Sequence, residues 1–140
     1  RAKRLGADEV IDYKAENVRQ RVQELTDGRR VDGVFEHVGQ ARWDRSIKSS
    51  TPGGRLVTCG NTTGWEAHTD LRYVFARQLT ILGSYMGSKA ELLELLPWIE
   101  AGRLQPVVHT VLPLHEAAHA HEILEAGRQF GKVVLEPPAD

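Results

Sequence analysis

The sequence predicts an α/β fold built on a mostly parallel sheet. Two apolar runs that each end in glycine, 31–39 and 53–60, have the β-branched and aromatic content of strands. Between the runs the pattern is helical, and earlier in the chain Val18, Val22 and Leu25 recur at i, i+4 and i+7 to form one apolar face. Strands spaced by helices of this length indicate right-handed crossovers between parallel strands.

Each element has a local signal for where it ends. Residues 1–5 read as the tail of a helix that Gly6 closes, because the position after a helix favours glycine. Pro97 lies inside a helical segment and is expected to kink or split it. We expect strands at 10–13, 31–38, 56–59, 79–85, 107–112 and 132–135, helices at 18–25, 41–51, 89–101 and 114–126, and a polar loop at 61–70. The strands at 31–38 and 56–59 are apolar nearly throughout, which is typical of strands covered on both faces.

Composition limits the classes of function. The 140 residues suffice for one domain, and a formal net charge of -1 provides no basic field for nucleic acid. No apolar run is long enough to cross a bilayer, so no membrane partner is expected. The single cysteine, Cys59, excludes an internal disulfide and is typical of a reducing compartment, which favours a cytoplasmic protein. The sequence begins with Arg1 rather than Met, so we expect its left end to have been cut or processed.

Four short motifs carry a family resemblance. They are residues 5–13 (LGADEVIDY), 35–39 (FEHVG), 53–57 (GGRLV) and 131–135 (GKVVL). In this order they resemble the medium-chain dehydrogenase/reductase superfamily, which includes zinc-dependent alcohol dehydrogenases and zinc-free quinone oxidoreductases. The resemblance runs from Arg1 to about Pro137. It implies a partial Rossmann fold followed by a strand-helix-strand that returns to a second domain.

The resemblance also implies a domain division and a strand order. Residues 1–104 would be part of a nicotinamide-dinucleotide-binding domain, and residues 105–140 the C-terminal segment of a GroES-like catalytic domain. The segment 10–13 would be the third Rossmann strand, and the strands that end at Gly39 and Gly60 the fourth and fifth. The segment 79–85 would then be the sixth strand. The first two strands, with the phosphate-binding loop, would lie upstream. The order 3-2-1-4-5-6 then predicts a gap in the centre of the sheet, and the chain alone should be unstable or prone to aggregation.

The resemblance places cofactor contacts at three strand ends and at one later cation. The adenine side of the dinucleotide would pack at the strand that ends at Gly39, and the nicotinamide would lie along the backbone at the strand that ends at Gly60. The carboxamide would bond main-chain groups after the strand at 79–85. The later cation would lie near the pyrophosphate. The residues are Val38 and Gly39, then Cys59, Gly60 and Asn61, then Ser84, Tyr85 and Met86, and finally Lys132.

Four of these positions also have a plain structural interpretation. Val38 and Gly39 fit a buried strand end with a turn glycine. Cys59 fits a small buried hydrophobe better than a nucleophile, because no basic partner is near it in sequence. Lys132 fits a solvated lysine at the start of a strand.

A second motif suggests different chemistry. Residues 115–119 (HEAAH) match H-E-x-x-H, in which two histidines one helical turn apart bind zinc and the glutamate acts as general base. Zinc then needs a third protein ligand, and the residues that follow do not continue the longer zinc-peptidase pattern. The same segment also fits an amphipathic helix that leaves His115 and His119 toward solvent. Its inner face would consist of Leu114, Ala117, Ala118, His121 and Leu124.

The functional prediction is the cofactor-binding part of an oxidoreductase that uses NAD or NADP and acts on a small molecule. Hydride would pass between nicotinamide and an alcohol, a carbonyl or an activated alkene. No residue is assigned as general acid, base or zinc ligand, and zinc in the intact protein would be held outside this segment. A non-catalytic dinucleotide-binding relative and the zinc peptidase are the alternatives. A homodimer or tetramer is expected through the exposed edge of 79–85.

Overall fold

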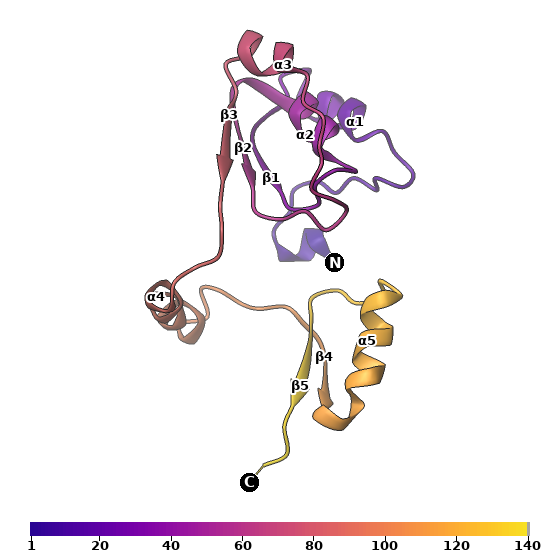
Figure 1. Cartoon of the computed structure of the whole chain (residues 1–140), viewed down its shortest axis with the longest axis vertical. Helices are drawn as coiled ribbons and strands as arrows, with labels where there is room; N and C mark the ends of the chain where they lie inside the picture. Colours follow the sequence, from indigo (N-terminus) through magenta and orange to yellow (C-terminus); the bar gives the residue numbers. More distant parts are fainter. Residues whose placement is uncertain (140) are drawn as a thin grey trace. The chain divides into compact units, whose positions relative to one another are not determined.

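The structure is a computed structural model that describes residues 1–139. The chain divides into two compact units, Arg1–Met86 and a second unit that begins at Gly87. Each unit has its own parallel sheet (Figure 1).

Helices and strands alternate in the first unit. They are η1 (Ala2–Leu5), α1 (Val18–Leu25), β1 (Val31–Glu36), α2 (Trp43–Ser49), β2 (Ser50–Thr58), α3 (Leu71–Ala76) and β3 (Thr80–Gly83). The strands form a parallel sheet in the order β1-β2-β3, in which Phe35 pairs with Val57 and Val57 with Leu82. The predicted parallel sheet and the predicted order of its last three strands are therefore confirmed.

One layer of helix covers this sheet. The helix α2 packs on β1 and β2, and α1 packs on α2. The contact buries Ile47 of α2 to 2% exposure and Leu56 of β2 to 1%. Because β1 presents alternate residues to opposite faces, Phe35 lies on the other face and is 73% exposed. The expectation that both faces of β1 are covered is thus wrong for the residues that the structure describes.

The predicted strand at 10–13 is not formed. The segment folds instead into a turn around Asp12, whose main-chain oxygen accepts hydrogen bonds from the amides of Ala15 and Glu16 at 3.0 Å and 2.7 Å. The Asp12 amide itself donates to the Glu16 carboxylate at 2.9 Å. A strand needs a neighbouring strand for its backbone groups, and within residues 1–139 the sheet of this unit ends at β1.

The helix α3 was not predicted. It begins after Asp70, whose side chain accepts the amide of Arg72 at 3.0 Å in a helix N-cap. At six residues it is too short to show a helical period in the sequence. The polar loop predicted at 61–70 does precede it.

The second unit contains α4 (Lys89–Glu100), β4 (Val108–Pro113), η2 (Leu114–Glu116), α5 (Ala117–Glu125) and β5 (Lys132–Glu136). The strands β4 and β5 are parallel, with Val111 opposite Val134, which confirms the predicted strand-helix-strand. A capping box of Ser88 and Glu91 starts α4, which then runs through Pro97 without a break. Of the two expected effects of Pro97, a split therefore does not occur, and a kink stays a prediction.

The helix α5 presents a different face inward from the one predicted. Ala120 and Ile123 are the buried residues, at 5% and 9% exposure, whereas His121 is exposed. The small side chain of Ala120 suits the face that lies against β4 and β5. In residues 1–139 no helix has the length and apolar character to cross a membrane.

Candidate functional site

Three strand ends lie side by side at one edge of the first sheet. Glu36, the last residue of β1, is in register with Thr58 of β2, and Thr58 is in register with Gly83 of β3. The amide of Cys59 continues the ladder to the Glu36 main-chain oxygen at 3.0 Å, and the amide of Ser84 to that of Thr58 at 2.9 Å. Parallel pairing therefore brings together the segments after all three strands. Eight of the nine predicted contacts, all except Lys132, follow these strand ends.

The two strand-end glycines allow two loops to touch. Gly39 has a φ of 86°, and a Cβ added there would lie 2.7 Å from the oxygen of Gly64. A Cβ added at Gly60 would lie 2.9 Å from the oxygen of His37. Both distances are far inside normal contact. These glycines are thus required for contact between protein segments, in addition to any role beside a ligand.

The loop after β2 is hydrogen-bonded to the turn after β1. Thr63 donates its amide and its hydroxyl to the main-chain oxygen of Val38, at 2.9 Å and 2.7 Å. The amide of Gln40 donates to Gly64 at 3.2 Å. Sequence reasoning missed Thr63 because its role depends on a contact with a residue 25 positions away.

Glu36 is the other residue that sequence reasoning missed. Its carboxylate is buried, with the residue 4% exposed, and accepts the amides of Val38 and Gly39 at 2.6 Å and 3.1 Å. The hydroxyl of Ser46 in α2 donates to the second carboxylate oxygen at 2.5 Å. Burial by itself raises the pKa of Glu36, but these three hydrogen bonds together lower it below its ordinary value. The available sequence signal was an acidic residue at the last position of a strand that is otherwise mostly apolar.

The remaining candidates at this edge are mostly exposed. Cys59 is exposed, so its interpretation as a buried hydrophobe is wrong; it lies just beyond the last residue of β2. Asn61 and Ser84 are exposed as well. Tyr85 and Met86 are 89% and 82% exposed. The edge therefore offers side chains and backbone that a ligand could reach.

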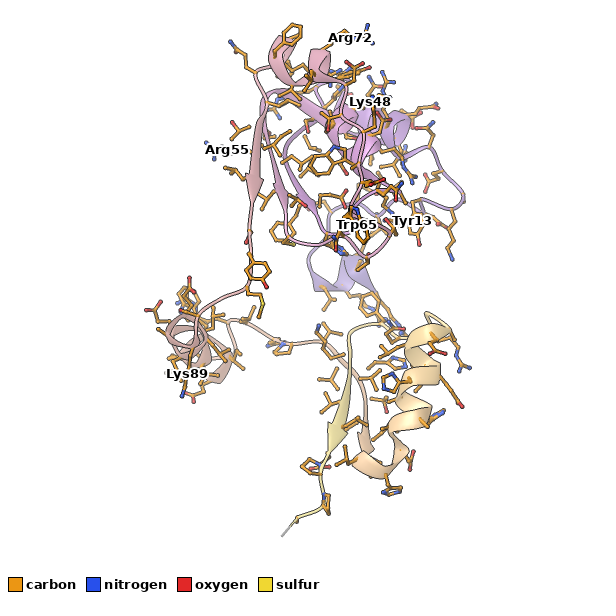
Figure 2. All side chains as sticks on the ribbon, viewed as in Figure 1. Tyr13, Lys48, Arg55, Trp65, Arg72 and Lys89 are labelled. Atoms are coloured by element: carbon orange, nitrogen blue, oxygen red, sulfur yellow. The ribbon has the colours of Figure 1, made fainter. Side chains whose placement is uncertain are left out.

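A cavity of about 340 Å³ runs beside β1 and reaches this edge. Its apolar lining includes Val22, Phe35 and Val38, and its polar lining includes Arg42 and Arg45. The guanidinium of Arg42 stacks over the ring of Tyr13 at 3.5 Å from the ring centroid. Figure 2 shows Tyr13 toward the end of the unit at which the strands finish, and Arg72 at the opposite end. An apolar wall beside stacked and cationic groups suits an aromatic base.

Lys132 belongs to the second unit. It opens β5, and its amide donates to the main-chain oxygen of Val107 at 2.8 Å. The preceding Gly131 has a φ of 101°, and an added Cβ there would collide with that same oxygen. The Lys132 side chain is exposed.

The H-E-x-x-H residues do not form a metal site. His115 lies in η2 and His119 in α5, and both are exposed. His119 contacts Glu122 at 3.3 Å. No group of three or more His, Cys, Asp or Glu side chains is arranged to hold a metal ion in residues 1–139. The donor set that zinc requires is thus not assembled by the described residues.

Comparison with known proteins gives a consistent group of relatives. The family described as Zinc-binding dehydrogenase matches residues 5–135. A quinone oxidoreductase of Pseudomonas aeruginosa is 37% identical over 145 residues, which cover 97% of this chain and 45% of that protein. The crystal structure of an NAD-dependent alcohol dehydrogenase superposes with a TM-score of 0.86 at 44% identity, covering 96% of this chain and 39% of that one.

A third relative was solved with ligands. The structure of the 2-octenoyl-CoA carboxylase reductase CinF in complex with NADP and 2-octenoyl-CoA has a TM-score of 0.83 at 30% identity. The match covers 96% of this chain and 34% of that one. The chain spans less than half the length of each of these three proteins.

Proposed function

Because the chain belongs to the zinc-binding dehydrogenase family, we propose that it is the cofactor-binding part of an NAD(P)-dependent oxidoreductase. The reaction is hydride transfer between the nicotinamide and a small molecule that carries an alcohol, a carbonyl or an activated alkene. The names of its relatives, a quinone oxidoreductase and an NAD-dependent alcohol dehydrogenase, support this range of substrates. The observation that carries the proposal is the alignment of three parallel strand ends at one edge, where open α/β sheets bind ligands.

The described residues fit the adenine half of such a cofactor. Val38 lines the cavity beside β1. The apolar wall of this cavity and its stacked Tyr13–Arg42 pair are suited to a flat heterocycle. The Val38 main-chain oxygen already accepts a hydrogen bond from Thr63, so Val38 contributes to binding through its side chain. We assign the adenine to this position.

The nicotinamide half is assigned to the next two strand ends. Residues 59–61 present backbone beside the ring, and residues 84–86 present main-chain groups to the carboxamide. When bound, the cofactor itself supplies the hydride chemistry. The chain's own residues orient it, because the two segments are held in register through the bonds of Cys59 and Ser84 to the sheet. Lys132 is proposed as a point charge near the pyrophosphate.

No metal-dependent step is assigned to these residues. The family's name refers to zinc, but the exposed His115 and His119 lack a third ligand among the described residues. No general acid or base is assigned within this chain either. We propose that those groups belong to a catalytic domain to which residues 105–140 contribute, residues 1–104 being the cofactor-binding part.

We further propose a homodimer or tetramer through β3. This strand pairs with β2 on one side, and in the described chain its other edge is unpaired. Ile81 and Leu82 of β3 are 38% and 44% exposed, and such apolar edges are normally covered. Light scattering on the intact protein tests this: the native form is expected as a dimer or tetramer, and Ile81→Lys as a smaller species. A native monomer contradicts it.

The cellular location is proposed to be the cytoplasm. The support is the single cysteine, which is typical of a reducing compartment.

Fluorescence titration of the intact protein with NADH and NADPH tests the cofactor assignment. Binding of either nucleotide, with enhancement of its emission, is expected, and turnover with a quinone, an enone or an alcohol completes the test. Binding without turnover on any of these classes favours the non-catalytic relative. The absence of binding of both nucleotides contradicts the proposal.

A further inference from the structure

We propose that Glu36 is a positioning residue that fixes the Val38–Gly39 turn for the cofactor without touching the cofactor itself. This inference rests on the proposed function, because it concerns the strand end assigned to the adenine.

The contacts of Glu36 connect the turn to the helix layer. One carboxylate oxygen accepts the amides of Val38 at 2.6 Å and Gly39 at 3.1 Å, and the other accepts the hydroxyl of Ser46 in α2. The main-chain oxygen of Glu36 also accepts the amide of Cys59, at 3.0 Å, in the second strand end. A single residue is thus bonded to both glycine-ended segments and to the helix behind them.

These contacts determine what the turn can offer to a ligand. Successive backbone amides in a turn can form an anion-binding concavity. Here a carboxylate of the protein already fills it, so the amides of Val38 and Gly39 are not available to a phosphate. The Val38 oxygen is occupied by Thr63 in the same way. Recognition at this turn is therefore left to the Val38 side chain, whose direction the turn sets.

The charge of Glu36 is compensated by hydrogen bonds. Burial raises its pKa and the bonds from Ser46, Val38 and Gly39 lower it, with a net lowering that leaves the group ionised at neutral pH. The ion pairs formed within residues 1–139 do not include it. Loss of the carboxylate leaves two amides without acceptors in a buried position, which frees the turn to change conformation.

Four variants of the intact protein test the role: Glu36→Ala, Glu36→Gln, Ser46→Ala and, as control, Glu66→Ala. Glu66 is an exposed carboxylate in the loop after β2. The dissociation constants for ADP-ribose, NADH and NADPH are measured well below the melting temperature of each variant, together with kcat at saturating cofactor.

We expect Glu36→Ala to weaken the affinity for ADP-ribose and for the preferred nucleotide by the same factor, about tenfold or more. The kcat at saturating cofactor should not change. Glu36→Gln is expected within about threefold of native, because its amide oxygen can accept both amides and its amide nitrogen can donate to Ser46. Ser46→Ala removes one bond and is expected to weaken binding by about threefold. The Glu66→Ala control is expected to bind as the native protein does.

A variant Glu36→Ala that melts earlier but binds ADP-ribose with native affinity overturns the positioning role. If Glu36→Ala does not fold, Ser46→Ala decides, and native affinity in that variant overturns the role. If the native protein binds no dinucleotide, the proposed function itself is wrong and the positioning role falls with it.

Discussion

Thr63 holds Val38 by two hydrogen bonds to one oxygen: its amide and its hydroxyl both donate to the Val38 carbonyl, at 2.9 Å and 2.7 Å. The same hydroxyl accepts the amide of Ala41 at 3.1 Å. Both main-chain groups of Val38 are thus hydrogen-bonded, the oxygen to Thr63 and the amide to Glu36. The turn is preorganised, which reduces the conformational entropy that binding would cost.

We predict that Thr63→Val weakens this turn. The variant keeps the amide bond and the shape of the side chain but loses both bonds of the hydroxyl, which costs about 1 kcal/mol of unfolding free energy. The affinity for the proposed nucleotide should fall with it. Thr63→Ser keeps a hydroxyl and serves as the control. Chemical denaturation and nucleotide titration measure the two effects, and equal behaviour of the two variants would contradict the prediction.

Two glycines with positive φ should respond differently to alanine. Gly53 has a φ of 74° and open space where a Cβ would lie, so Gly53→Ala should cost about 1 kcal/mol for the backbone alone. Gly39→Ala meets the same backbone cost and also collides with Gly64, so its loss should be larger by about 1–3 kcal/mol. Thermal melting of the two variants measures the difference. Equal melting temperatures would contradict the prediction, because they would show that the two loops move apart to accommodate the added Cβ.

The Asp70 carboxylate should titrate far below its ordinary value. The hydrogen bonds from the Arg72 guanidinium and amide lower the pKa of Asp70 from 3.8 to about 2. Because the folded pKa is depressed, the stabilisation is complete above 3.8 and is lost as the pH falls toward 2. In Arg72→Gln, NMR titration should find the pKa raised toward 3.8. Asp32, whose pKa is lowered by Arg29, is the internal control and should not move.

Cys59 provides a chemical probe of the strand ends. It is exposed, and it follows β2 where the nicotinamide is assigned. We predict that a thiol reagent labels Cys59 in the free protein and that saturating nucleotide slows the labelling, because the bound cofactor would cover it. Adenosine monophosphate, which would reach only the Val38 end, should protect less. Equal labelling rates with and without nucleotide would place the nicotinamide elsewhere.

The 140-residue chain by itself should be weakly stable. Within residues 1–139 the buried apolar side chains are few, namely Ile47, Leu56, Ala120 and Ile123. The open face of β1 exposes Phe35, and the outer edge of β1 is unpaired in the described chain. Calorimetry and light scattering should find a broad transition or aggregation. A cooperative melt of a monomer would contradict this prediction.

Much of the fold could be predicted from the sequence, because local patterns define its elements. The helix at Val18–Leu25, the strand that begins at Val31 and the strand-helix-strand at the end are read from apolar spacing and from glycines at helix ends. The predictions failed where the structure depends on which strands pair with one another. The segment 10–13 has the composition of a strand, but its backbone groups are satisfied by the turn at Asp12. Cys59 looked like a core residue, yet it lies beyond the last buried position of β2.

The family resemblance implied the order of the last three strands. The sequence by itself determined the parallel α/β class and the glycines that end two of the strands. Those features follow from the period of apolar residues and from the φ angles that glycine permits, which are local properties of the chain. Tertiary structure alone decided that the glycines serve contact between two loops, and that Glu36, Ser46 and Thr63 hold the turn between them. Those contacts join residues 10 and 25 positions apart. Folding brings such residues together, and no sequence period records them.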